Sequence, residues 1–200
     1  KELAATAAGA LTVGVWGPDP SSGLPSDGMQ RRLRVADPAC EQPRYASDVA
    51  AAQALCNEVN PAVILAPASS RMQRIVAGLA NRIGGDVDTH ITGLEWKDGK
   101  VFAHRWYYRQ RMEAAFTRNS DRPWILTTES GIAEAAKADG PAEFETIDAS
   151  IPDSRTRVIE VEGTEAGDQT IRPDAKLLLV AGAGWTKKQP DGAAHADKAS

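Results

Sequence analysis

Apolar residues follow two spacings along the chain, one typical of buried strands and one typical of amphipathic helices. Unbroken apolar runs predict strands buried on both faces, as in a parallel sheet. Apolar positions three and four residues apart predict helices with one buried face. The predicted strands are residues 11–16, 33–36, 62–67 and 124–128, and the predicted helices are residues 2–8, 45–59 and 69–83.

Polar and glycine residues at the expected ends support these helices. Ser47 or Asp48 can serve at the start of the helix over 45–59, and Ser69 and Ser70 can cap the next one. Two consecutive glycines end that second helix at residues 84–85. A strand, helix, strand, helix order predicts a parallel sheet with covering helices.

The pattern changes after residue 86. Two apolar runs surround an Asp-Gly turn at residues 97–100, which predicts an antiparallel hairpin. The resulting fold class is α/β, with a mostly parallel sheet, helices on both faces and an antiparallel hairpin extension. The hairpin strands are expected at residues 87–96 and 101–108, with continuation at 113–118, a short helix at 132–138 and further strands at 158–161 and 177–180.

Composition narrows the class of protein. The 200 residues are 42% hydrophobic and 25% charged, which excludes a disordered or collagen-like chain. The longest apolar run, residues 177–183, is far shorter than the roughly 20 residues of a membrane-spanning helix. A net charge of −4 argues against nucleic acid as a partner. Two cysteines outside any CxxC pair favour a reduced, cytoplasmic protein.

Metal and nucleophile signatures are weak. The soft ligand candidates lie at least fourteen residues apart along the chain, whereas zinc ligands usually come in close pairs, so we expect no metal site. We also expect no catalytic nucleophile, because Gly-x-Ser-x-Gly is absent. Ser130 follows a strand, where it can face a ligand or, in the simpler interpretation, cap a helix. The soft ligand candidates are Cys40, Cys56, His90, His104 and His195.

Two loops have the composition of anion sites. Ala68, Ser69 and Ser70 leave a buried strand and open a helix, whose first amides can hold an anion. The same residues are explained equally well as a turn with a cap. Gly182 and Gly184 follow a predicted strand, but no third glycine completes a dinucleotide fingerprint.

Aromatic and basic residues gather on the predicted hairpin. On a strand, Trp106 and Tyr108 share one side, and Arg105, Tyr107 and Arg109 share the other. Stacking rings between cations can bind single-stranded nucleic acid, but the acidic chain favours a protein interface instead. The expected aromatic patch is Trp96, Phe102, Trp106 and Tyr108. Spacing and composition alone thus predict an α/β domain without a visible active site.

Five stretches together resemble the N-terminal domain of the electron transfer flavoprotein alpha subunit. The most specific is a Pro-x-hydrophobic strand that ends in Ala-Pro-Ala-Ser-Ser, and another is an Arg-x-x-Tyr element from Arg105 to Tyr108. Gly184 stands where that family usually carries an arginine, which sets this chain apart. The five stretches are residues 2–17, 60–70, 97–108, 123–128 and 177–184.

The resemblance implies an electron carrier rather than a substrate-converting enzyme. It implies that FAD is held mainly by a missing C-terminal domain, with Gly182 and Gly184 as the nearest cofactor-binding positions, and that this chain alone holds none. Residues 1–180 would form the α/β domain and 181–200 a linker, and the family's first strand would precede Lys1. The implied partners are a beta subunit and an electron-donating dehydrogenase.

Two other interpretations remain open. One is a free-standing nucleotide- or anion-binding domain that uses the Ala68 to Ser70 loop. The other is an interaction module built around the aromatic hairpin. Partner binding distinguishes them, because the first requires a nucleotide or anion and the second a protein.

Overall fold

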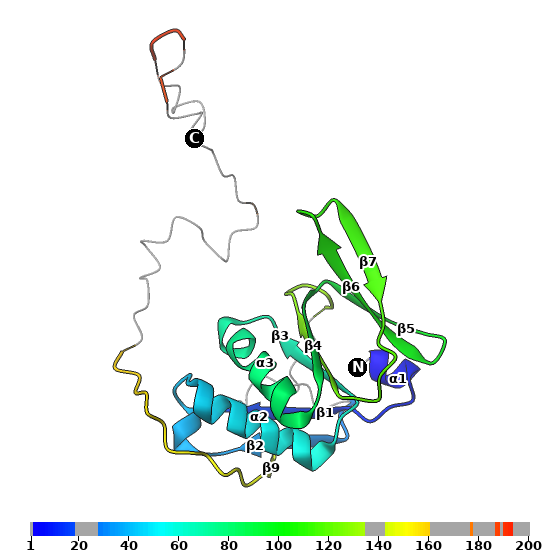
Figure 1. Cartoon of the computed structure of the whole chain (residues 1–200), viewed down its shortest axis with the longest axis vertical. Helices are drawn as coiled ribbons and strands as arrows, with labels where there is room; N and C mark the ends of the chain where they lie inside the picture. Colours follow the sequence, from blue (N-terminus) through cyan, green and yellow to red (C-terminus); the bar gives the residue numbers. More distant parts are fainter. Residues whose placement is uncertain are drawn as a thin grey trace. The chain divides into compact units, whose positions relative to one another are not determined.

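The computed structural model describes residues 2–18, 28–134, 143–160, 177, 187–188 and 190–193. The chain divides into two units, residues 1–158 and 159–200. Every helix and strand of the described residues lies in the first unit (Figure 1). In chain order they are α1 (Glu2–Thr6), β1 (Thr12–Trp16), β2 (Arg31–Val35), the 3-10 turn η1 (Pro38–Cys40), α2 (Tyr45–Val59), β3 (Val63–Pro67), α3 (Ser70–Ile83), β4 (Asp86–Ile91), β5 (Gly93–Lys97), β6 (Lys100–Tyr107), β7 (Met112–Phe116), β8 (Trp124–Thr128) and β9 (Glu145–Thr146).

The parallel strands form two separate sheets. The first has the order β1-β2-β9 and the second the order β3-β8-β4. β3 and β4 both pair in parallel with β8, so β8 is the central strand, and four of its five residues are buried. The α/β class, with parallel sheets beside helices and an additional antiparallel sheet, is therefore confirmed.

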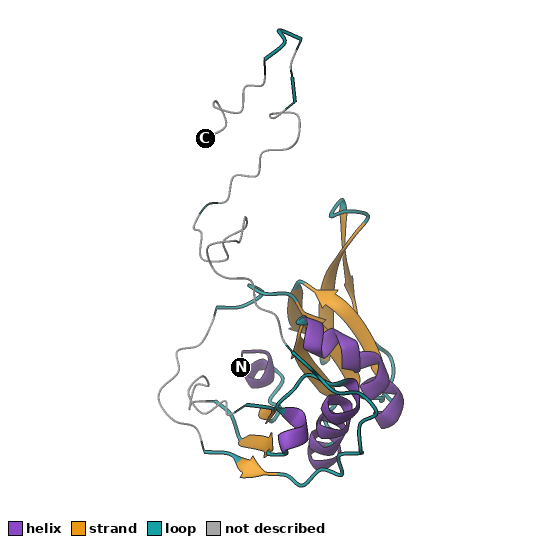
Figure 2. Cartoon of the chain, turned by 90° about the vertical axis from the view of Figure 1, so that its left-hand side faces the viewer, coloured by secondary structure: helices purple, strands orange, loops and turns teal. Residues whose placement is uncertain are grey.

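The antiparallel sheet has the order β5-β6-β7 and projects as a hairpin from the parallel strands (Figures 1 and 2). Asp98 and Gly99 join β5 to β6 and both have positive φ, 51° and 75°, as a two-residue type I′ turn requires. The rings of Phe116 and Trp124 meet edge to face at 6.1 Å, which links β7 to β8.

α2 and α3 lie side by side and share a core (Figure 1). Val49 and Ala52 of α2 pack with Ile75 and Leu79 of α3 and with Ile125 of β8. The opposite flank of α2 presents residues to a second core cluster beneath β2, with Ala51, Leu55, Leu33, Val35 and Cys40 as its buried members. One helix thus contributes to both cores.

The predicted strand over residues 87–96 is wrong as a single element. Residues 86–91 form β4, parallel to β8, and residues 93–97 form β5, antiparallel to β6. The register of β4 shifts between Asp88 and Ile91, and His90 within the shift has a φ of 59°. This bulge bends the chain away from the parallel sheet and toward the antiparallel one.

The last predicted elements do not form where the structure describes them. Residues 132–134 do not form a helix, and residues 158–160 do not form a strand. Ile159 is 86% exposed, so its side chain gains nothing from burial, and β pairing needs a neighbouring strand. Residues 135–138, 161 and 178–180 lie outside the described residues, whereas β9 was not anticipated.

Candidate functional site

The loop from Ala68 to Ser70 connects β3 to α3 and uses its polar atoms internally. The Ser69 hydroxyl accepts a hydrogen bond from the Met72 amide at 3.3 Å, and its carbonyl accepts one from Gln73 at 2.9 Å. The Ala68 amide donates to the Thr128 carbonyl at 2.9 Å. Ser69 is therefore the N-cap of α3, and these contacts favour the capping interpretation over an anion site.

The first turn of α3 also sends Arg71 inward. Its Nη2 atom donates to Asp48 Oδ1 at 2.6 Å and its Nε atom donates to Asp48 Oδ2 at 2.9 Å. Asp48 is fully buried and also accepts from Trp16 Nε1 at 3.0 Å. A charge this deep requires a partner, and this network joins α2, α3 and β1.

A bound anion near this loop would need the positive charge of Arg71, and the same network already uses it. Arg71 Nη2 also donates to the Cys40 carbonyl at 2.6 Å, so the guanidinium is committed to protein groups. Ser47 and Asp48 lie in the first turn of α2, as expected, but neither caps it. The N-cap position is Arg44, which makes no side-chain capping bond. The Ser47 hydroxyl donates to the Arg44 carbonyl at 3.4 Å, and the Asp48 carboxylate pairs with Arg71.

A hollow of about 490 Å³ lies where β4 and β8 end. We call it the carboxyl-edge hollow, since parallel-sheet proteins hold ligands at the carboxyl ends of their strands. β4, the residues after β8, β6 and the turn after β6 all contribute to it. Its lining residues are His90, Thr92, Trp106, Arg109, Gln110 and Glu129.

Local contacts fix part of this lining. His90 Nδ1 lies 2.7 Å from Glu129 Oε1, which makes an ion pair whenever the imidazole is protonated. The Thr92 hydroxyl donates to the His104 carbonyl at 3.3 Å. Trp106 is 44% exposed. Arg109 and Gln110 have φ values of 55° and 63°, a conformation that non-glycine residues adopt at a cost.

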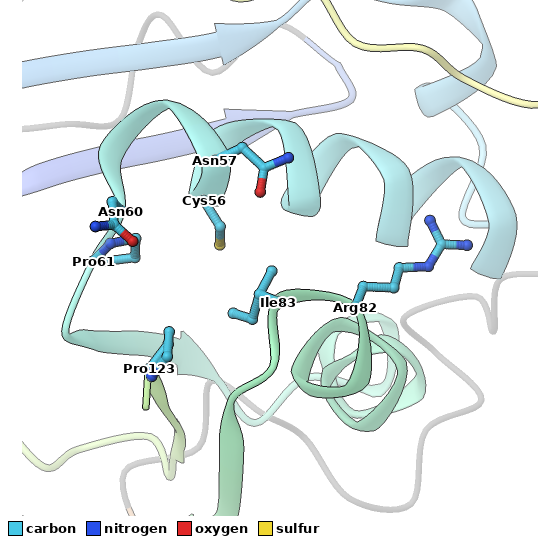
Figure 3. Close-up of a pocket in the computed structure, with 7 residues that line it drawn as sticks. All are labelled: Cys56, Asn57, Asn60, Pro61, Arg82, Ile83 and Pro123. Carbon is cyan, nitrogen blue, oxygen red and sulfur yellow. The ribbon is translucent and has the colours of Figure 1, made fainter. Parts of the chain in front are cut away.

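A second hollow, of about 350 Å³, lies at the opposite ends of the strands (Figure 3). It is bounded by the end of α2, the end of α3 and the residue before β8. Figure 3 shows the Cys56 sulfur and the Ile83 side chain extending into it. Arg82 reaches back to α2, where its Nη1 donates to Gln53 Oε1 at 3.1 Å. Arg82 is the charged residue among those that line this hollow, and its hydrogen-bond partner is the neutral Gln53 amide.

Neither cysteine has the character of a reactive thiol. Burial raises the pKa of the Cys40 thiol to about 11, and the nearby carboxylates of Asp37 and Asp48 raise it further. Burial alone raises the pKa of Cys56 to about 11. Both thiols are therefore protonated near neutral pH, and the thiolate is the nucleophilic form.

The aromatic hairpin has two different sides. Arg105 lies 4.6 Å from the centre of the Tyr107 ring and donates to the Thr89 carbonyl, so this side packs against the protein. On the other side Trp106 is exposed, and in the turn Tyr108 is 76% exposed. Trp96 and Phe102 are partly buried. Met112, which the sequence did not single out, adds to the exposed surface.

The remaining candidates are a metal site, a membrane helix, Ser130 and the loop of Gly182 and Gly184. Among the described residues no cluster of three His, Cys, Asp or Glu side chains could hold a metal, and no helix there has the length and apolarity to cross a membrane. Ser130 lies exposed in the turn after β8. Gly182 and Gly184 lie outside the described residues.

Sequence reasoning did not find the pairs of residues that are distant along the chain and adjacent in the fold. His90 and Glu129 are 39 residues apart, and Asp48 and Arg71 are 23 apart. A positive φ at His90 has no sequence signal. An aspartate one turn into a helix with an arginine in the next helix is a signal, but only once the two helices are known to pack together.

Comparison with known proteins supplies what local geometry does not. Residues 1–152 match the family model described as the electron transfer flavoprotein domain. None of the curated proteins matches the sequence. The match covers the parallel sheets, α1 to α3 and the antiparallel hairpin. The chain therefore belongs to the electron transfer flavoprotein domain family.

Proposed function

We propose that this chain is the N-terminal domain of an electron transfer flavoprotein alpha subunit. In this role the intact protein accepts electrons at FAD from a dehydrogenase and passes them on, in the cytoplasm. The observation that carries the proposal is the family match over residues 1–152. The Arg-x-x-Tyr element at the end of β6 and the strand that ends in Ala66 and Pro67 favour the alpha subunit.

The FAD would be held mainly by a domain that follows this one. Gly182 and Gly184 would lie near it, because a glycine backbone permits close approach. Residues 1–180 would form the α/β domain and 181–200 the linker to the flavin domain. In the first unit, which ends at residue 158, the Arg71 guanidinium beside the Ala68 to Ser70 loop is already paired with Asp48. It is not free to bind a phosphate, which supports a cofactor held elsewhere.

The partner would be a beta subunit that contacts the aromatic hairpin. Trp106, Tyr108 and Met112 are each at least 44% exposed, and aromatic residues and methionine are enriched at interface cores. Arg109 and Arg111 lie in the same turn, and arginine is a frequent interface anchor. The hairpin thus has the composition of an interface.

The experiment is copurification of the longer chain with its beta subunit, followed by absorbance spectroscopy. We expect a stable pair with a flavin spectrum, and a chain of residues 1–200 without flavin. Tyr108→Ala should weaken the pair at least tenfold, whereas Lys97→Ala at the end of β5, beside the other hairpin turn, should not. A longer chain that neither pairs nor carries flavin would contradict the proposal.

The anion-binding interpretation gains no support from the contacts. Ser69 caps α3 and Arg71 is paired with Asp48. It remains a prediction of the sequence alone. We therefore put forward one function.

A further inference from the structure

We propose that the carboxyl-edge hollow binds a planar aromatic molecule that carries a carboxylate or another singly charged anionic group. The proposal does not rest on the electron-carrier function, but Trp106 and Arg109 of this hollow also belong to the hairpin surface proposed for a beta subunit, so a ligand and that subunit would compete for them. It concerns a site formed entirely by described residues of the first unit. Three features carry it: where the hollow lies, how its backbone is held, and which side-chain groups are free within it.

The location is the first feature. β4 and β8 are adjacent parallel strands, and His90, Thr92 and Glu129 all lie at or just beyond their carboxyl ends. Side chains that leave neighbouring strands at this edge converge on one point, which is why open α/β sheets bind ligands there. The volume of about 490 Å³ is within the range of small-molecule sites.

The backbone is the second feature. Seven non-glycine residues of the described chain have positive φ, and three of them, His90, Arg109 and Gln110, line this hollow. Such conformations cost free energy and concentrate at sites where a side chain must be aimed. Here the bulge at His90 turns its ring to Glu129, and the turn after β6 directs Arg109 and Gln110 to the same hollow.

The free groups are the third feature. His90 Nδ1 lies 2.7 Å from Glu129 Oε1, so these two side chains are engaged with each other and the Arg109 guanidinium is the remaining charged group of the lining. In the described part of the chain neither Arg109 nor Gln110 has a side-chain partner. The half-exposed indole of Trp106 offers a flat apolar face beside them.

These groups together define the ligand chemistry. A guanidinium binds a carboxylate through a pair of parallel hydrogen bonds. An indole face stacks on a planar ring. The Gln110 amide can bond either to the anion or to a ring substituent. A ligand that lacks either the ring or the anion leaves one of these groups unused.

The test uses the chain as it exists and three small probes. 2-Naphthoate has both the ring and the anion, 2-naphthalenemethanol has only the ring, and acetate has only the anion. The readout is the indole N–H signal of Trp106 in a ¹H–¹⁵N spectrum, assigned from Trp106→Phe. We expect saturable binding of naphthoate at least about tenfold tighter than either other probe, the ratio that one charge-assisted contact supplies.

Matched variants locate the contact. Arg109→Gln should weaken naphthoate about tenfold and leave naphthalenemethanol unchanged, whereas Arg111→Gln, in the same turn but outside the lining, should have no effect. Trp106→Ala, which lacks the indole signal and is followed through the backbone amide of Arg109, should weaken both ring probes about tenfold, whereas Tyr108→Ala should weaken neither. Melting temperatures show whether each variant is folded. If Arg109→Gln is unfolded, Arg109→Lys replaces it. Lysine keeps the charge but cannot form the paired hydrogen bonds, so this variant should also weaken naphthoate binding.

Several results would overturn the proposal. One is no saturation by naphthoate up to about 10 mM, a concentration that detects even millimolar binding. Another is equal affinity for naphthoate and naphthalenemethanol, or an equal effect of the Arg109 and Arg111 variants. Loss of beta-subunit affinity in Arg109→Gln without any naphthoate binding would assign the hollow to a protein interface instead. The electron-carrier test measures beta-subunit pairing and flavin in the longer chain, so either proposal can fail without the other.

Discussion

Asp48 shows how one residue can organise a fold without taking part in its chemistry. It is fully buried, and it accepts hydrogen bonds from Arg71 and Trp16. These partners come from α3 and β1, while Asp48 itself is on α2. The buried charge therefore specifies how three elements meet, and its cost is offset only while all partners are present.

Asp48→Ala is expected to lower the free energy of unfolding by about 3–5 kcal/mol, because it leaves the Arg71 guanidinium without its carboxylate. Urea denaturation measures this. The control is Glu58→Gln at the exposed Arg31 pair, which should cost less than about 1 kcal/mol. Asp48→Ala combined with Arg71→Met should recover part of the loss. An Asp48→Ala variant as stable as the parent would contradict the role given to the network.

The two cysteines lead to a prediction about pH. Their pKa values are raised to about 11 in the folded chain, from an ordinary value of 9.0. The folded state therefore keeps its protons longer than the unfolded state. This stabilisation is complete below about pH 9 and is lost as the pH rises through 11.

We expect both thiols to react slowly with a thiol reagent at pH 8 and rapidly after unfolding in urea. We also expect the stability of the parent chain to fall more steeply between pH 9 and 11 than that of Cys56→Ala. Comparison of the two chains removes the contribution of lysine and tyrosine titration. Fast labelling of the folded chain at pH 8 would show that the thiols are accessible as thiolates.

At the scale of elements, the sequence predicts best where one face of a helix or both faces of a strand are buried. The helix over 45–59 and the strand over 124–128 have the expected bounds, because their apolar spacing follows directly from burial on the helix face and in the central strand. The strand over 87–96 failed because a bulge is a backbone event, and His90 carries no signal for it. Residues 158–160 do not form the predicted strand, because an apolar run needs a pairing partner.

The candidate site was harder to predict than the elements. Ser69 could be anticipated as a cap because capping is local. The carboxyl-edge hollow could not, since it depends on where β4, β8 and the turn after β6 come together. Residue types at that turn were noticed as a basic and aromatic patch, but the positive φ values of Tyr108, Arg109 and Gln110 have no signal in the sequence.

That turn supplies the prediction at the scale of elements. Tyr108, Arg109 and Gln110 have φ values of 51°, 55° and 63°, in a region that costs a non-glycine residue about 1–2 kcal/mol. Gln110→Gly removes the steric cost but adds flexibility to the unfolded chain. We expect a net gain in stability of up to about 1 kcal/mol.

Ala77→Gly is the control for that substitution. Ala77 is exposed on α3, where glycine should instead lower the stability by about 1 kcal/mol. Both variants are measured by thermal and urea unfolding. If Gln110→Gly destabilises the chain as much as Ala77→Gly does, the turn is not strained.

The whole first unit has an unusual feature in its two parallel sheets. β1 ends one sheet and β3 ends the other, yet Trp16 of β1 and Ile64 of β3 pack against the same core cluster. Leu65, in the middle of β3, is 49% exposed. An apolar strand of this kind is normally covered on both faces and paired on both edges. β1 and β3 therefore each present one edge that no strand of the described residues pairs.

These open edges predict a difference in hydrogen exchange within the first unit. The backbone amides of β1 and β3 that face the open edges should exchange at least about tenfold faster than amides of β8, because they lack strand partners. β8 is paired on both sides and serves as the internal control. Ile64→Asp should destabilise the chain by several kcal/mol, since Ile64 packs against the core cluster and the substitution places an unpaired charge there. Equal exchange in β1, β3 and β8 would show that the edges of β1 and β3 are covered.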